Sequence, residues 1–382
     1  MWIFFIALPS AILGLNVFLA WAAWTLFFPY RKWQIAAAGT ALAGLAVFAI
    51  SFAGFLFRAH GNPVFEFAWE FLAFALVPTV YLAFWALAGM TLGKIFPKLK
   101  RFKFAFAGTG AVLVAAVCIY GFWRFENPCV THLAWTPKTG ALVEISAEES
   151  AKRDPKLRIV ATADWHLGAR IERVRTDNFV RCVNAQEPDV VVIAGDLIDG
   201  RIEPVESAKL DEILRKIDAP LGVFATLGNH EYFGDLPKQK AFIRRSGIHL
   251  LCDEHVLVND GEGMKMLFVG RDDASNSARR PLARIFKKIP ESVLRDLSVF
   301  VIDHQPKAYK EAVSSGANFV FSGHTHAGQL WPATWLVGFF NPHVHGIWRE
   351  AGTCGYVTSG LGLWHIPYRI GSCSELVVID VF

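Results

Sequence analysis

The stretch Val190–Asp199, VVVIAGDLID, decides the fold of the larger part of this sequence. Its five leading apolar residues, rich in valine, are typical of a strand buried on both faces of a sheet. Gly195, Asp196 and Asp199 follow at once, so polar side chains stand where the strand ends. In α/β folds, ligands gather beyond the carboxyl ends of the strands. This stretch therefore predicts an α/β domain with a polar site at one edge of its sheet.

Four other short apolar runs show the same pattern, because each is followed directly by a cluster of polar residues. The expected strands are Leu157–Ala161, Leu221–Thr226, Val299–Ile302 and Phe319–Phe321. The clusters that follow them contain Asp164, His166, Asn229, His230, His304, His324 and His326. Periodic stretches between the runs predict connecting helices at Thr176–Ala185, Glu206–Ile217 and Lys238–Ser246. We expect the clusters to meet beyond the strand ends.

The donor atoms in these clusters are imidazole nitrogens and carboxylate or amide oxygens, without thiolates. This mixture suits Mn²⁺, Fe²⁺ or Zn²⁺. One carboxylate can bridge two ions about 3.5–4 Å apart, which is the arrangement that two-metal hydrolysis requires. Taken singly, the residues have ordinary explanations, since Asp199 could cap a helix and Asn229 could stabilise a turn. Five clusters at five strand ends favour a metal centre.

The order Asp-x-His, Gly-Asp-x-x-Asp, Gly-Asn-His-Glu, a lone His and Gly-His-x-His resembles the calcineurin-like metallophosphoesterase superfamily over nearly all of residues 157–382. Four segments resemble its membrane-attached bacterial subgroup: Gly323–Gln329, Tyr356–Gly362, Pro367–Gly371 and Ser374–Leu376. That subgroup includes phosphodiesterases and lipid-precursor pyrophosphatases. The resemblance implies two packed mixed β-sheets flanked by helices, in the order α/β/β/α.

The resemblance also implies a role for each site residue. One metal ion would be held by Asp164, His166 and His326, and the other by Asn229, His304 and His324, with Asp196 bridging both. A metal-bridging hydroxide would attack phosphorus directly, while His230, oriented by Asp199, stabilises or protonates the leaving oxygen. Mn²⁺ is the preferred metal, with Zn²⁺ and Fe²⁺ as alternatives. Asp303 departs from the family pattern, in which an apolar or small residue is commoner at this position.

Two arginines are candidates for substrate binding. Arg271 and Arg369 could each grip phosphate oxygens bidentately, and a surface ion pair is the alternative for both. His343 and His345 match no motif, so surface or structural roles are favoured over substrate contact. A metal-dependent phosphoester hydrolase is the first hypothesis. A metal-bearing interaction or regulatory module with little turnover is the second, and a transporter with an accessory domain is the third.

The first 124 residues differ sharply in composition from the rest. They hold nine Lys and Arg against two Asp and Glu, whereas residues 125–382 hold 29 against 32 and the whole chain carries a net charge of +4. Four apolar stretches reach the length of about 20 residues that a membrane-spanning helix needs: 2–28, 33–57, 67–90 and 104–123. The excess positive charge lies beside these stretches, so it does not indicate a nucleic-acid partner.

We expect three regions: a transmembrane domain of four helices at 1–124, a juxtamembrane linker at 125–156 and the catalytic domain at 157–382. Seven Lys and Arg fall in the first and third connectors, against three in the second connector and after the fourth stretch. The positive-inside rule then places the chain in the plasma (inner) membrane with residues after 124 on the periplasmic or extracellular side. A bilayer partner favours a lipid-linked phosphate, phosphodiester or pyrophosphate as substrate.

Two features stay open at this point. Trp331–Phe340 is almost entirely apolar and follows the last histidine cluster. It either dips into the lipid headgroups or contacts the membrane helices, or it packs into the core of the domain. The six cysteines show no metal-binding spacing, and buried free thiols are expected, although a Cys354–Cys373 disulfide is conceivable in an outward-facing domain.

Overall fold

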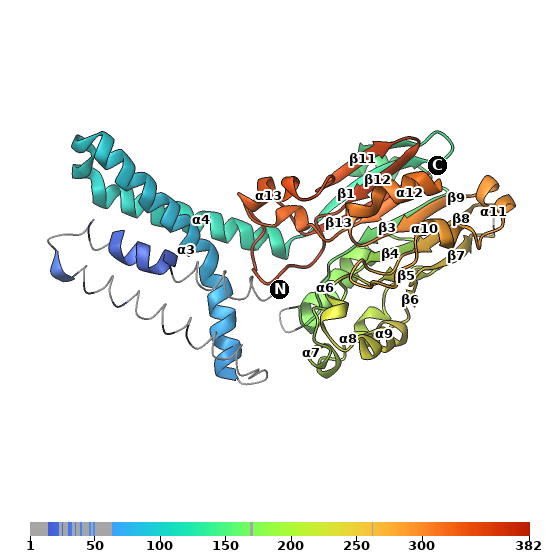
Figure 1. Ribbon diagram of the computed structural model, residues 1–382, viewed down its shortest axis with the longest axis horizontal. Coiled ribbons are helices and arrows are strands. Elements are labelled where there is room, and N and C mark those ends of the chain that lie inside the picture. Colours follow the sequence, from blue (N-terminus) through green and yellow to red (C-terminus); the bar gives the residue numbers. More distant parts are fainter. Residues whose placement is uncertain are drawn as a thin grey trace. The chain divides into compact units, whose positions relative to one another are not determined.

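The computed structural model describes residues 14–22, 25, 30–32, 35, 39, 46, 49, 63–168, 171–261 and 263–382 of the 382-residue chain. The chain divides into two compact units (Figure 1). The first contains residues 1–123 and 365–368, and the second contains residues 124–364 and 369–382. In the described part of the chain, every strand belongs to the second unit.

Two long helices dominate the described part of the first unit. They are α3 (Pro63–Ile95) and α4 (Lys103–Glu126), joined by the 3₁₀ helix η1 (Pro97–Phe102). The segments Ala73–Ile95 and Pro97–Glu126 are long and apolar enough to cross a membrane. They correspond to the third and fourth expected spans. The first two expected spans, 2–28 and 33–57, lie largely outside the described residues, so two candidate helices are seen where four were expected.

α3 and α4 pack through aromatic rings that lie against glycines. The rings of Trp85 and Phe106 stack with centroids 4.7 Å apart, and Nε1 of Trp85 donates to the carbonyl oxygen of Phe106 at 2.9 Å. A side chain at Gly89 or Gly110 would collide with these rings. Small residues at such positions allow two apolar helices to approach closely without a hydrophobic driving force.

The second unit contains a seven-stranded and a six-stranded mixed sheet. The first has the order β2-β1-β13-β3-β4-β5-β6 and contains β1 (Cys129–Thr136), β2 (Ala141–Ile145), β3 (Leu157–Thr162), β4 (Val190–Ala194), β5 (Val223–Thr226), β6 (His249–Leu250) and β13 (Glu375–Val381). The second has the order β11-β12-β10-β9-β8-β7 and contains β7 (Glu254–Asn259), β8 (Lys265–Gly270), β9 (Ser298–Ile302), β10 (Phe319–Ser322), β11 (Gly346–Glu350) and β12 (Thr353–Val357).

Helices cover the outer face of each sheet (Figure 1). Those on the seven-stranded sheet are α6 (Arg173–Asn184), α7 (Glu203–Ser207), α8 (Leu210–Leu214) and α9 (Leu236–Arg245). Those on the six-stranded sheet are α10 (Leu282–Phe286), α11 (Glu291–Asp296) and α12 (Tyr309–Ser315). The shorter elements are α5 (Ala147–Lys152), η2 (Glu231–Phe233), η3 (Pro306–Ala308), η4 (His326–Gly328), α13 (Ala333–Leu336) and η5 (Val337–Phe339).

Strand β4 shows how the residues produce the layers. Its alternate residues Val191 and Ile193 pack against the helices, whereas Val190, Val192 and Ala194 pack against the six-stranded sheet. A strand that is apolar on both sides in this way must lie in the middle of a layered fold. The expected α/β order with two mixed sheets and helices on both outer faces is confirmed.

The five expected strands form β3, β4, β5, β9 and β10, and their ends agree within two residues. The helices expected over Thr176–Ala185 and Lys238–Ser246 are α6 and α9. The helix expected over Glu206–Ile217 is instead divided into α7 and α8. Lys209 separates them in the left-handed conformation, with φ 50°, which interrupts the helical hydrogen bonding.

Residues 125–156 are not a linker, and this prediction is wrong. They contain β1, β2 and α5, and β1 lies between β13 and β2 in the larger sheet. Its register sets Cys129 opposite Glu375 and Trp135 opposite Val381. The ring of Trp135 is fully buried, with its centroid 4.9 Å from that of Phe319. One of the two pairing partners of β1, the strand β13, lies at the far end of the chain, so no local pattern reveals that pairing.

A disulfide joins Cys129, the first residue of β1, to Cys373 just before β13. The alternative pair Cys354–Cys373 is not formed, because Cys354 is buried and free. The expectation of free thiols is therefore correct for the four cysteines at 118, 182, 252 and 354, and wrong for the other two.

Candidate metal centre

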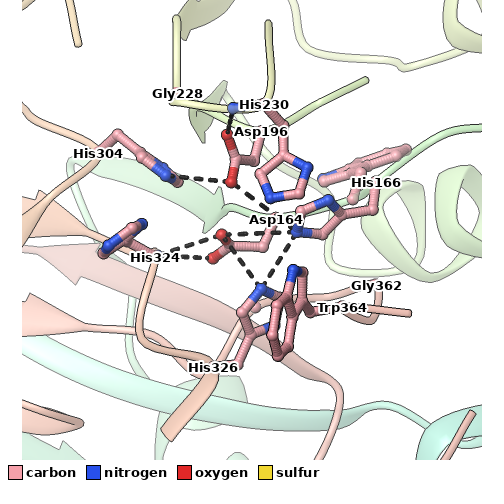
Figure 2. A network of polar contacts seen from close by, with 12 residues as sticks. Asp164, His166, Asp196, Gly228, His230, His304, His324, His326, Gly362 and Trp364 are labelled. Atoms are coloured by element: carbon pink, nitrogen blue, oxygen red, sulfur yellow. Dashed lines mark hydrogen bonds and ion pairs between the residues drawn. The ribbon is translucent and has the colours of Figure 1, made fainter. Parts of the chain in front are cut away.

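Five strand ends converge on one site between the sheets. β3, β4 and β5 are parallel neighbours in the larger sheet, and β9 and β10 are parallel neighbours in the smaller one. The residues that follow these strands are Asp164 and His166, Asp196 and Asp199, Asn229 and His230, His304, and His324 and His326. The contacts described below join all nine, so the structure brings together every residue that the sequence predicts as a metal ligand or catalytic group. Figure 2 shows the two aspartates Asp164 and Asp196 with the five histidines of the site.

A first group consists of Asp164, His166 and His326, whose ligand atoms lie within 4.8 Å of one another. Nε2 of His166 and Nε2 of His326 are 3.1 Å apart. The same two atoms lie 4.0 and 3.7 Å from Oδ1 of Asp164 (Figure 2). All three side chains are buried. Two imidazole nitrogens and a carboxylate oxygen that point to one position can hold a divalent cation.

A second group consists of Asp196, His304 and His324. Oδ2 of Asp196 lies 3.2 Å from Nε2 of His304 and 3.9 Å from Nε2 of His166, which belongs to the first group. Asn229 joins this second group, with its Oδ1 3.2 Å from Nε2 of His304. Asp196 therefore lies between the two groups, where a bridging carboxylate is expected.

The ring of His304 tests whether these residues fit a metal ion. Its Nδ1 lies 2.8 Å from the carbonyl oxygen of Ala194, which accepts a hydrogen bond and so keeps the proton on Nδ1. Nε2 then faces Oδ2 of Asp196 and Oδ1 of Asn229, each at 3.2 Å. A ring nitrogen and two oxygens that face one position are a donor set that suits a cation. The donor set fits a divalent metal ion, and the hydrogen bond to Ala194 orients the ring as in other metal sites.

The backbone of the site adopts a sparsely populated conformation. Five of the predicted ligands have left-handed φ angles: Asp164 (55°), His166 (50°), Asp196 (50°), His324 (71°) and His326 (49°). Such residues cost about 1–3 kcal/mol each and persist only where the surrounding structure holds them. The concentration of strain at these strand ends marks the site as functional.

Glu231 holds the loops of the second group, and the sequence analysis assigned it no role. Its buried carboxylate accepts N–H groups from Asp196 at 3.1 Å, Ile198 at 2.9 Å and Gly228 at 2.7 Å. A Cβ at Gly228 would collide with Oδ1 of Asp196, so only glycine fits there. The last letter of the motif Gly-Asn-His-Glu was the available signal, since a buried acid must find donors.

His230 and Asp199 form a pair beside the first group. Nδ1 of His230 lies 2.7 Å from Oδ1 of Asp199, and the backbone N–H of His230 donates to Oδ1 of Asp196 at 2.8 Å. Burial alone would lower the pKa of His230, but the hydrogen bond with Asp199 and the charge of Asp196 outweigh it and raise the pKa. The ring is therefore favoured as a proton donor next to the two groups.

The pKa values of the carboxylates and imidazole rings of the site are shifted in different directions. Burial raises the pKa of Asp164. Burial acts in the same direction on Asp196, yet the neighbouring His304 outweighs it and holds the pKa of Asp196 well below its usual range. Burial and the charge of His304 lower the pKa of His324 to about 4, so this ring is neutral and free to use a lone pair. Neutral imidazole is the form that binds metal ions.

Arg369 does not reach toward a substrate, and its predicted role is wrong. The fully buried guanidinium donates to the carbonyl oxygens of His326 at 3.1 Å, Ser359 at 2.7 Å, Gly360 at 3.0 Å and Gly362 at 2.6 Å. Its Nη2 also lies 3.4 Å from Nδ1 of His326. These contacts leave no pair of donors for a phosphate. Arg369 instead fixes the loop that carries His326.

Arg271 is likewise occupied. The buried side chain pairs with Asp303 at 3.1 Å and with Glu311 at 2.8 Å. Asp303 also accepts from Arg279 at 2.6 Å. This buried ion pair explains why an acid precedes His304, and it differs both from phosphate binding and from the surface ion pair that was the alternative.

A second buried carboxylate lies in the same unit. Glu375 accepts hydrogen bonds from five residues: the hydroxyls of Thr131, Tyr356 and Thr358, Nε2 of His345, and the N–H and hydroxyl of Ser359. Burial alone would raise its pKa, but the hydrogen bonds from His345 and Tyr356 lower the pKa to about 2. His345 thus has a structural contact, in line with the favoured interpretation, and the ring of His343 stacks on Trp348.

The sequence of this chain resembles those of known proteins, and the matches include the residues of the site. Residues 157–328 match the family model of the calcineurin-like phosphoesterases. A transmembrane protein with metallophosphoesterase domain from Danio rerio is 33% identical over 276 residues, which cover 70% of this chain and 61% of that protein. An uncharacterized metallophosphoesterase from Helicobacter pylori is 32% identical over 230 residues, 60% of each chain. One from Aquifex aeolicus is 29% identical over 243 residues, 61% of this chain and 88% of that one.

The chain spans about 60% of the length of the first two of these relatives. They come from an animal and a bacterium, so they do not assign the chain to a bacterial subgroup. The matched residues 157–328 include all nine residues gathered at the site. The motifs, the two-sheet fold and these matches agree on a calcineurin-like phosphoesterase domain that includes residues 157–328 of this chain.

Proposed function

We propose that the chain is a membrane-anchored phosphoesterase that uses two divalent metal ions. The single observation that carries this proposal is the convergence of seven metal-binding side chains and one histidine–carboxylate pair from five strand ends. We assign Asp164, His166 and His326 to one ion and Asn229, His304 and His324 to the other. Asp196, between the groups, bridges them. When bound, such a pair of ions activates water and neutralises charge on a phosphoryl group.

The chain's own residues supply positioning and a proton. His230 stands beside the first group, with its ring centroid 4.5 Å from that of His166. Its hydrogen bond with Asp199 fixes the ring and favours the protonated form. We assign to His230 the donation of a proton to the leaving oxygen, and to Asp199 the positioning of His230. Arg369 and Glu231 position the loops that carry the ligands.

The donor set limits the metals. Nitrogen and oxygen ligands without thiolate suit Mn²⁺, Zn²⁺ or Fe²⁺, and we propose Mn²⁺ as the preferred ion. Two buried carboxylates, Asp164 and Asp196, offset part of the charge of two such ions. A mixed centre with two different ions is compatible with the unequal ligand groups.

We propose that four helices anchor the chain in the inner membrane and that residues after 124 face the periplasm or the exterior. The excess of Lys and Arg in the first and third connectors supports this orientation. The Cys129–Cys373 disulfide supports it independently, because disulfides persist in oxidising compartments and are rare in the cytosol. A cysteine introduced at the exposed Val174 should react with a membrane-impermeant maleimide in intact bacterial cells, and protection there would reverse the orientation.

A membrane anchor favours a phosphate, phosphodiester or pyrophosphate carried by a lipid as the substrate. The supporting observation is the apolar length of the two described helices. A screen of membrane lipid extracts, read by phosphate release and mass spectrometry, tests this part. Turnover of water-soluble esters alone would contradict the lipid-linked substrate and leave the phosphoesterase proposal standing.

The core proposal is tested with the purified full-length chain and a chromogenic phosphodiester. Hydrolysis should require Mn²⁺ or another divalent ion and should be lost in Asn229→Ala, and His230→Ala should lose hydrolysis of an alkyl phosphodiester. His255→Ala, an exposed histidine on β7, is the matched control and should keep full activity. Metal binding without turnover in the parent, over several metals and esters, would favour the interaction or regulatory module instead.

A further inference from the structure

A strongly apolar surface lies directly beyond the metal-binding loops. The helical turns α13 and η5 expose Trp335, Leu336, Phe339 and Phe340, whose exposed fractions are 72%, 47%, 75% and 78%. These four residues are called the aromatic face below. They are spaced at i, i+1, i+4 and i+5, so they lie on one side of consecutive helical turns. The interpretation that this segment packs into the core of the domain is therefore wrong.

The aromatic face is held firmly to the loop of His326. The 3₁₀ helix η4 begins at His326 and ends at Gly328, and a Cβ at Gly328 would collide with the backbone of Thr334. The N–H of Thr334 donates to the carbonyl oxygen of Leu330 at 3.0 Å, and Leu330 is bridged to Ile370. The aromatic face thus cannot move far without displacing the histidine loop.

The end of the apolar helix α4 is equally firmly held by the second unit. Phe125 is fully buried in the core beneath α6, and its carbonyl oxygen accepts from Oγ of Ser374 at 3.1 Å. Arg175 lies over the ring of Phe125 and pairs with Glu126. The last residues of α4 are therefore part of the folded second unit, and no linker separates this candidate membrane helix from that unit.

We infer that the aromatic face inserts into the interfacial layer of the lipid bilayer and holds the metal-binding loops at the membrane surface. Residues 323–348 contain no Asp, Glu, Lys or Arg, so insertion costs no charge burial. Tryptophan and phenylalanine beside an apolar surface are typical of interfacial contacts with lipid. A protein partner would usually meet arginine and a polar rim with hydrogen bonds. Apart from the indole N–H, the four side chains of the face offer no hydrogen-bonding group.

This contact would bring phosphates at the headgroup level to the ligand loop that carries His326. The inference rests on the proposed membrane anchoring, but it does not depend on hydrolysis. Its test must therefore detect the position of the aromatic face without any turnover.

The experiment uses the full-length chain in nanodiscs of ordinary or dibrominated phosphatidylcholine, because bromine quenches tryptophan only at contact. The contribution of Trp335 is the tryptophan fluorescence of the parent minus the tryptophan fluorescence of Trp335→Phe. We expect brominated lipid to reduce this difference at least about twofold, as for a ring inserted in the interface. Trp348→Phe is the matched control: Trp348 is buried in the same unit, so its contribution should be the same in both lipids.

An unchanged Trp335 contribution in brominated lipid would overturn the inference. If that contribution also depends on the number of chains per disc, a second copy covers the face, and the inference is equally overturned. Metal content and phosphodiester turnover are measured on the same samples. A metal-free or inactive sample with clear quenching would therefore contradict the proposed function alone.

Discussion

Two buried carboxylate clusters lie in the same folded unit, and they differ in what faces the oxygens. Glu375 is surrounded by hydroxyl, amide and imidazole groups that donate to it. Asp164 and Asp196 each accept from a backbone N–H but otherwise face imidazole nitrogens, and the nitrogens of His166 and His326 lie only 3.1 Å apart. A complete buried network stabilises a fold. Several imidazole nitrogens gathered around two carboxylates are instead a donor set that suits a divalent cation. The gathering of imidazole nitrogens around the carboxylates therefore distinguishes the candidate metal centre from the structural cluster around Glu375.

One short link joins the two clusters. Ser359 donates its N–H to Glu375 at 2.8 Å, and its carbonyl oxygen accepts from Arg369 at 2.7 Å. Arg369 in turn donates to the carbonyl oxygen of His326 at 3.1 Å. We expect the effect of a substitution on activity to decrease along this path, from the proposed metal ligands Asp164 and Asp196 to Glu375.

The largest effect is expected for Asp196→Asn. The amide keeps the shape and the hydrogen bond from the backbone of His230, but it removes the charge shared by both ligand groups. Turnover of a chromogenic phosphodiester should fall about 10⁴-fold, as for the loss of a central catalytic group. Elemental analysis should show fewer bound metal ions. Asp211→Asn on α8, a half-buried aspartate that pairs with Arg215 away from the site, is the control. Full activity in Asp196→Asn would contradict the bridging role.

His230→Asn is expected to separate chemistry from metal binding. Loss of a general acid typically costs about 10²–10⁴-fold in rate, while both metal ions should stay bound because His230 is not a proposed ligand. The loss should be large for an alkyl ester and small for a nitrophenyl ester, whose leaving group needs no proton. His255→Asn is the control. An equal loss with both leaving groups would exclude proton donation by His230.

Arg369→Lys tests the link between the clusters. Lysine cannot span four carbonyl oxygens, so the loop of His326 should loosen. Residues that hold metal ligands in place typically change metal affinity about 10–100-fold. Metal titration of the activity should show weaker binding, with recovery at high metal concentration. Arg271→Lys is matched in burial but lies in the Asp303 ion pair, and it should lower thermal stability without changing metal affinity.

Glu375→Gln should have the smallest effect on activity and a clear effect on stability. The folded-state pKa of Glu375 is about 2, against an ordinary value of 4.5. Because the pKa is lowered, the stabilisation is present above pH 4.5 and is lost as the pH falls through 2. It amounts to about 3 kcal/mol at neutral pH. Thermal melts of the parent and the variant should therefore differ most near pH 7 and converge at low pH; a constant difference would contradict this role.

The convergence of the nine candidate site residues was predictable because its signals are local. Each ligand follows its own apolar run directly, as Asp196 follows β4 and His304 follows β9, so the strand and the donor are read together. The layered fold followed from the same runs, because a strand such as β4 is apolar on both sides. The five strand ends lie close together because β3, β4 and β5 are parallel neighbours in one sheet and β9 and β10 are parallel neighbours in the other.

The predictions that failed concern long-range partners. β1 was taken for a linker because its neighbour β13 is encoded at the other end of the chain. Arg369 was assigned to substrate because its acceptors are backbone carbonyl oxygens, which no residue pattern reveals. The same holds for Arg271, whose partner Asp303 lies on a different strand end. A basic residue near a phosphate site is thus only a candidate until its acceptors are known.

The position of β1 has a practical consequence for anyone who wants the water-soluble part alone. A fragment that begins at Leu157, where the motifs begin, would strip β1 from β13 and leave a long apolar strand edge open to other molecules. Such a fragment should aggregate. A fragment that begins before Arg124 keeps all seven strands of the larger sheet paired. It also carries the last turns of the apolar helix α4 into solution. The usable cut lies within those few residues.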